Sequence, residues 1–155
     1  MDARTRFERT REAIPRLNDV KLLLMYDGDD WKPPAIKAHT ETADPTANRA
    51  IYNVDERAEL LEALRKEERE LTQLIGESLV IITAVREGFG EKYADVLDAR
   101  YIDNETWTEI AKRYESNHRG KETITTRTVQ NWAQVAFDWI DSVGVSRLLR
   151  GEVDV

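Results

Sequence analysis

Residues 100–140 decide how this chain folds, and they read RYIDNETWTEIAKRYESNHRGKETITTRTVQNWAQVAFDWI. Thr106 and Glu109 have the T-x-x-E spacing of a capping box, in which each side chain satisfies a backbone N–H at a helix start. One apolar helical face follows at positions i, i+3, i+4 and i+7, made by Trp107, Ile110, Ala111 and Tyr114. The pattern predicts a helix that begins at Thr106.

A second helix is predicted after a polar, basic connection. Thr125 and Thr126 are both suitable N-caps, because a threonine hydroxyl accepts a bond from a free N–H at a helix start. Gly144 is the expected end, since glycine is common just past the end of a helix. The apolar residues expected to be buried recur at helical spacing, and they are Val129, Trp132, Ala133, Ala136, Trp139, Ile140 and Val143.

The order of these residues resembles the helix-turn-helix of sigma-factor region 4. The residues that match its pattern are Arg100, Tyr101, Trp107, Glu109, Ile110, Ala111, Thr126, Arg127, Thr128 and Val129. Such motifs normally place about three or four residues between their helices. Here residues 115–124 intervene, and they either fold as a wing-like loop or extend one of the helices.

The net charge of −7 by itself argues against a nucleic-acid partner. Most of the acidity lies in one region, however, because residues 52–98 hold 12 acidic and 6 basic side chains. Residues 111–132 hold five basic and two acidic side chains, a net charge of +3. The local field around the expected DNA-facing helix can therefore be positive.

A helix over residues 1–26, with Pro15 breaking or kinking it, is predicted to precede a polar linker over residues 27–50. Acidic neighbours dilute the four arginines at its start, which favours an exposed face of mixed charge; they are Arg4, Arg6, Arg9 and Arg11. No metal site is expected: the acids Asp27, Asp29 and Asp30 lack the order of a calcium loop, and His39 and His118 are isolated.

A long helix is predicted over residues 51–88, ended by Gly88 and Gly90. Positions 61, 68, 75 and 82 and positions 64, 71, 78 and 85 form a heptad seam, apolar except at Glu68 and Ser78. Such a stripe must be buried. Its partner is either the helix at residues 1–26, packed as an antiparallel hairpin, or a second copy of the chain in a homodimer.

The fold predicted is all-α: a long, coiled-coil-like antiparallel helical hairpin, followed by a C-terminal three-helix unit over residues 91–150. The unit begins with a short helix over 91–102 and a turn at Asp103-Asn104. After Gly144, a last helical turn is expected to pack back on it through Val145, Leu148 and Leu149.

The whole layout resembles small phage and prophage proteins related to the ArpU and RinA late transcription activators. The resemblance implies a sequence-specific regulator of double-stranded DNA in the cytoplasm of a bacterial host. It implies that the second helix enters the major groove by its N-terminal end. The base-reading residues would be Thr126, Arg127, Gln130, Asn131 and Gln134, and the phosphate-binding residues Lys112, Arg113, Arg119, Lys121 and Thr125.

Two other readings remain open. The acidic long helix can serve a protein-interaction module, for example one that contacts RNA polymerase, and a small terminase-like DNA-packaging protein has similar parts. An enzyme is not expected, because the sequence has no glycine-rich phosphate loop and no nucleophile–histidine–acid set, and no cofactor is implied. The lack of cysteine favours a reducing cytosol, and the apolar runs are far below about 18 residues, so no membrane partner is expected.

Overall fold

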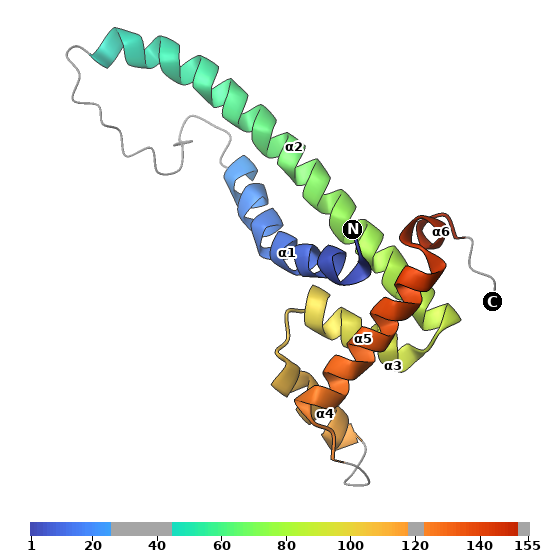
Figure 1. Ribbon diagram of the computed structural model, residues 1–155. Helices are drawn as coiled ribbons and strands as arrows, with labels where there is room; N and C mark the ends of the chain where they lie inside the picture. The colour runs from blue at the N-terminus through green and yellow to red at the C-terminus, as the bar shows by residue number, and fades with distance from the viewer. Residues whose placement is uncertain (26–44, 118–122, 152–155) are drawn as a thin grey trace. The chain divides into compact units, whose positions relative to one another are not determined.

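The structure, a computed structural model, describes residues 1–25, 45–117 and 123–151, and all regular secondary structure in these ranges is helical (Figure 1). The elements in order are α1 (Ala3–Met25), α2 (Pro45–Gly88), α3 (Glu91–Leu97), the π-helical turn η1 (Asp98–Ile102), α4 (Trp107–Asn117), α5 (Thr126–Val143) and α6 (Val145–Leu149). The predicted all-α class is confirmed.

The long helix α2 begins earlier than the sequence indicates. A linker is predicted up to residue 50, whereas α2 begins at Pro45. Proline is favourable at the first helical position, because its missing N–H needs no partner there and its φ is already helical. The linker prediction is therefore wrong for residues 45–50, and the rest of it, with His39 and the three early aspartates, lies outside the described residues.

Pro15 does not end α1, which continues from Ala3 to Met25. The helix tolerates the loss of one backbone donor at this position. By its internal contacts the chain nevertheless divides into two compact units at this point of α1: residues 1–15 with 73–155 form unit 1, and residues 16–72 form unit 2. The sequence predicts α2 packed on α1 and a C-terminal unit over residues 91–150, and by their contacts α1 and α2 each contribute to both units.

Unit 2 joins the end of α1 to the first two thirds of α2. Arg16 forms a two-pronged ion pair with Glu67, with Nε–Oε1 at 2.5 Å and Nη2–Oε2 at 2.9 Å. Both side chains are about a third to half exposed, so the pair contributes at most about 1 kcal/mol. The apolar seam is what the unit buries, through Leu17, Val20, Leu61 and Leu64.

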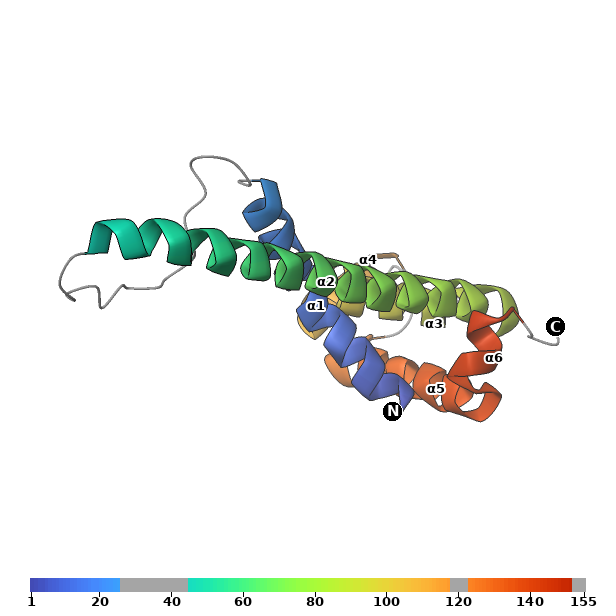
Figure 2. The ribbon, with the colours of Figure 1, turned by 90° about the horizontal axis from the view of Figure 1, so that it is seen from above.

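Unit 1 is built around α5, which packs against α3, α4 and α6. The first turns of α1 lie beside α5 (Figure 2), and there the Ala3 N–H donates to Asp141 Oδ1 at 2.9 Å. Phe7 of α1 contacts the rings of Tyr101 and Phe137, with both centroid distances 5.7 Å. The start of α1 therefore belongs to the core of the C-terminal helices, a contact that the sequence does not predict.

One polar position of the heptad seam, Ser78, is fully buried in unit 1. Its hydroxyl is 2.6 Å from that of Thr10, which also donates to the Arg6 carbonyl at 3.0 Å. Beside it, Arg6 and Glu77 form an ion pair of 2.6 Å. A serine is therefore accommodated in an otherwise apolar seam, because α1 supplies the partner that a buried hydroxyl requires.

The helix predicted over residues 91–102 is present, but its last turn is a π-helix in which the Asp103 N–H donates to the Asp98 carbonyl at 3.0 Å. Asn104 follows with φ of 57°, a left-handed conformation that asparagine tolerates better than most residues. The turn predicted at Asp103-Asn104 is confirmed. The residue types do not predict the π-helical turn η1. Turns of this kind are frequent at functional sites.

Candidate nucleic-acid interface

Thr106 caps the start of α4. Its hydroxyl oxygen accepts a hydrogen bond from the Glu109 N–H at 3.2 Å, which is one half of the predicted capping box. The inward face is also as predicted, since Ile110 and Ala111 are buried while Trp107 and Tyr114 pack partly buried against the same core. The first of the two helices predicted around Glu109-Ile110-Ala111 therefore begins where expected.

Thr125, rather than Thr126, caps α5. Its oxygen accepts a bond from the Thr128 N–H at 3.3 Å, and its backbone is extended, with φ of −98° and ψ of 168°. Just before it, Ile124 is buried. Of the inserted residues, 115–117 extend α4, whereas 118–122 lie outside the described residues, and with them His118, Arg119 and Lys121.

The buried face of α5 differs from the predicted one at its edges. Val129, Ala133, Ala136 and Ile140 are buried as expected, but so is Phe137, which the prediction omitted. Trp132, Trp139 and Val143 are only partly buried. Gly144, with φ of 97°, ends the helix as predicted, and α6 follows directly.

All five residues expected to read bases are exposed on α5: Thr126, Arg127, Gln130, Asn131 and Gln134. Three of them, Gln130, Asn131 and Gln134, form one wall of an open groove of about 420 Å³. The opposite wall consists of Arg4, Tyr101 and Trp107. The polar side of α5 therefore faces α1 and η1 along part of its length.

Gln134 is held by neighbours within the protein. The Arg4 guanidinium donates to its side-chain carbonyl, and its amide nitrogen donates to Asp138 Oδ1 at 2.9 Å. A role for Gln134 in reading bases would require it to give up these bonds. Arg127, Gln130 and Asn131 lie nearer the N-terminal end of the helix.

The three described residues among those expected to bind phosphates have different surroundings. Lys112 is exposed on α4, and Thr125 is exposed but serves as the N-cap. The Arg113 guanidinium is 2.8 Å from Glu105 Oε1. It also lines a hollow with three carboxylates, Asp95, Asp98 and Asp103, and burial, reinforced by the charges of Asp103 and Asp95, raises the pKa of Asp98. Arg113 is therefore largely neutralised by acidic neighbours.

An aromatic contact joins α4 and α5. The rings of Tyr114 and Trp132 lie edge to face, 5.3 Å apart, and the Lys92 ammonium lies 4.5 Å from the Trp132 ring centre. Burial of Tyr114, with a smaller contribution from Asp95, raises the pKa of Tyr114 to about 12.

The raised pKa of Tyr114 predicts a pH dependence of stability. The folded chain holds this proton more tightly than the unfolded chain, so its contribution is complete below the ordinary value of 10 and is lost as the pH rises from 10 to about 12. Tyr114→Phe should make the loss of stability across this range shallower than in the wild type. Urea unfolding at a series of pH values measures the difference, and parallel curves for the two proteins would contradict it.

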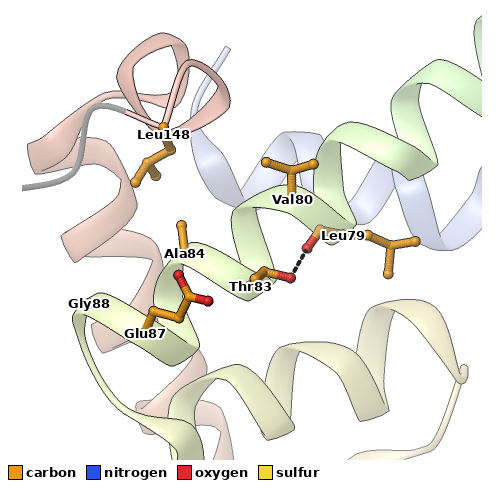
Figure 3. Close-up of a pocket in the computed structure, with 8 residues that line it drawn as sticks. Leu79, Val80, Thr83, Ala84, Glu87, Gly88 and Leu148 are labelled. Atoms are coloured by element: carbon orange, nitrogen blue, oxygen red, sulfur yellow. Dashed lines mark hydrogen bonds between the residues drawn. The ribbon is translucent and has the colours of Figure 1, made fainter.

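A second hollow, apolar and of about 430 Å³, lies between the end of α2 and α6 (Figure 3). Its lining residues are Leu79, Val80, Thr83, Ala84, Glu87, Gly88, Leu148 and Gly151. Leu79 and Val80 are 42% and 46% exposed, and as sequence neighbours that line the same hollow they form an exposed apolar surface. The sequence marks these two residues only as part of a short apolar run.

Within residues 1–25, 45–117 and 123–151, no helix is long and apolar enough to cross a membrane, and no group of three acidic, histidine or cysteine side chains is placed to hold a metal ion. The arrangement instead offers polar and cationic side chains along α5 and its surroundings. No protein-family model, no curated protein and no solved structure matches this chain.

Proposed function

We propose that this chain is a sequence-specific regulator that binds double-stranded DNA through α4 and α5, with the N-terminal half of α5 in the major groove. One observation carries the proposal: Thr126, Arg127, Gln130 and Asn131 form an exposed polar row at the start of a helix whose opposite face is buried. Arginine pairs with guanine, and glutamine or asparagine with adenine, through two hydrogen bonds each. The sigma-region-4-like order of the sequence supports the same reading.

The start of α5 suits the approach of a polyanion for a further reason. Backbone N–H groups of the first helical turn point away from the helix body, and the helix dipole adds partial positive charge there. The Thr125 side chain satisfies one of these donors, that of Thr128, whereas a helix start has four N–H groups without a partner inside the helix. A phosphate beside the first turn would accept from them, which would set the register in which Arg127 meets a base edge.

Arg127→Ala should lower discrimination between the preferred site and other sequences by about 1–3 kcal/mol, because one bidentate base contact is lost. A site is first selected from random duplexes with the wild-type chain, and binding is then measured to this site and to a scrambled one at two salt concentrations. The matched control is Arg147→Ala, which removes an equal charge from an exposed position of α6. Equal loss on both duplexes, or the same loss of discrimination in the control, would remove the role assigned to Arg127.

A second candidate function is a protein-interaction module, and the apolar hollow around Leu79 and Val80 favours it. Exposed apolar surface of this kind often marks a binding site for another protein. The resemblance implies RNA polymerase as a partner, while self-association would agree with a homodimer or with a ring of the terminase type. If the wild-type chain binds no duplex even at low salt, this candidate replaces the first. The mass of the free protein in solution then distinguishes a monomer, which would bind a different protein, from a homodimer and from a larger ring.

A further inference from the structure

Three arginines converge on one cleft beside α5. Arg4 and Arg11 come from the first turns of α1, and Arg100 comes from η1 (Asp98–Ile102), about ninety positions later in the chain. The cleft has a volume of about 260 Å³, and its other lining residues are Glu8, Glu12, Tyr101 and Trp107. It lies entirely within unit 1.

Two of these arginines carry a buried hydrogen-bond donor that the described residues do not satisfy. The Nε atoms of Arg11 and Arg100 are buried, and neither has a hydrogen-bond partner among the described residues. Arginine carries only donors, and a buried donor without an acceptor is unfavourable, because it has lost its bonds to water and gained none in the protein. The protein therefore does not supply all the acceptors that these two guanidinium groups can use.

Two of the three guanidinium groups, those of Arg100 and Arg4, are held in place by contacts within the protein. Arg100 lies over the Trp107 ring at 4.7 Å and donates from Nη1 to the Glu105 carbonyl at 3.2 Å. Arg4 lies 5.5 Å from the centre of the Phe137 ring and bonds to Gln134. Because these partners are neutral, they orient the two guanidinium groups without neutralising them.

The neighbouring positive charges also repel one another. Burial lowers the pKa of Arg100, and the charge of Arg11 lowers it further. Glu8 and Glu12 are exposed on the α1 side and reduce the cleft to one net positive charge, as three arginines face two glutamates. A small anion with several acceptor oxygens suits this site better than a single carboxylate, because it can bond to more than one guanidinium at a time.

We infer that this cleft binds a phosphate of the DNA backbone, so that the first turns of α1 form part of the nucleic-acid interface. The cleft and the groove along α5 share the residues Arg4, Tyr101 and Trp107, and the far wall of that groove carries Gln130 and Asn131. A strand whose bases face α5 can therefore place a phosphate against Arg11 and Arg100. The inference rests on the proposed function and adds a contact that the helix-turn-helix resemblance does not supply.

Arg11→Gln in the full chain tests the inference. Losing one phosphate contact should weaken binding roughly tenfold on the selected duplex and the scrambled duplex alike, and should reduce the salt slope by about one, with the preferred sequence unchanged. The matched control is Arg9→Gln, which removes the same charge from an exposed position of α1 outside the cleft. Equal losses in the two variants, or wild-type binding by Arg11→Gln, would overturn the inference.

A second variant guards against misfolding of the first. Glu12→Gln removes a carboxylate from the cleft wall and should tighten binding to both duplexes, more than Glu62→Gln does on the exposed side of α2. If Glu12→Gln and Glu62→Gln bind both duplexes with equal affinity, the result contradicts the proposed role of the cleft. If the wild-type chain binds no duplex at all, the inference and the proposed function fail together. If Arg127→Ala loses discrimination while Arg11→Gln binds normally, only the cleft is refuted.

Discussion

Replacing Phe137 with alanine should lower the free energy of unfolding by about 3–5 kcal/mol. The side chain is only 1% exposed, and it packs against Phe7 of α1 and Tyr101 of η1 at centroid distances of 5.7 and 5.6 Å. Truncation removes the transfer free energy of a large ring. It also leaves a cavity that three different elements cannot close together, and it loses two aromatic contacts.

The measurement is urea unfolding followed by tryptophan fluorescence and, separately, by helical circular dichroism. Val135→Ala is the matched control on the same helix, because Val135 is 41% exposed and should cost no more than about 0.5 kcal/mol. A change below about 1 kcal/mol for Phe137→Ala would mean that the three-ring contact does not stabilise unit 1, and the core described around α5 would have to be revised.

The omission of Phe137 from the predicted core has a physical cause. The central positions of the stripe, such as Val129, Ala133 and Ile140, follow from helical periodicity alone. The edges of a stripe depend on what lies beside the helix. Phe7, more than a hundred positions away in sequence, covers the Phe137 edge, whereas Trp132 at the other edge meets Tyr114 and Lys92 and stays partly exposed.

Features set by local chemistry were predictable from the sequence. Thr106 as an N-cap, the turn at Asp103-Asn104 and the end of α5 at Gly144 each depend on one residue and its immediate neighbours. The exposure of Arg127 and Gln130 follows from the same helical period. Contacts between distant segments were not predictable in this way, because composition and period do not state which helix covers which face.

The same distinction between local and long-range features applies to the candidate site. The polar row on α5 could be named from the sequence, whereas the arginine cleft could not. Arg4 and Arg11 have acidic neighbours in the sequence, and this pattern predicts one exposed face of mixed charge. Only the packing of Phe7 against Tyr101 brings that stretch of α1 next to Arg100 and gives its arginines a shared cleft. A local charge pattern does not contain this information.

Phe7→Ala should also destabilise unit 1 by about 3–5 kcal/mol, and the loss should reach α5 rather than stay in α1. Phe7 is fully buried between Tyr101 and Phe137. Amide hydrogen exchange, followed residue by residue, measures how far the effect spreads. Amides in the middle of α5, around Ala136, should exchange faster in Phe7→Ala than in Leu22→Ala, which changes a residue of α1 that is 51% exposed.

The sequence predicts that residues 91–150 form a helical domain of their own, and the exchange experiment decides between that boundary and the one drawn by the contacts. If residues 91–150 fold independently, Phe7→Ala will loosen α1 and leave the amides of α5 protected from exchange.

Urea unfolding of the double variant Phe7→Ala/Phe137→Ala tests the same point. If the start of α1 belongs to the same core, the double variant will lose less stability than the sum of the two single losses, by about 0.5–3 kcal/mol, because both changes remove the same ring contact. This outcome is the expected one, because Arg4 and Arg11 belong to the unit that carries α5, as the arginine cleft requires.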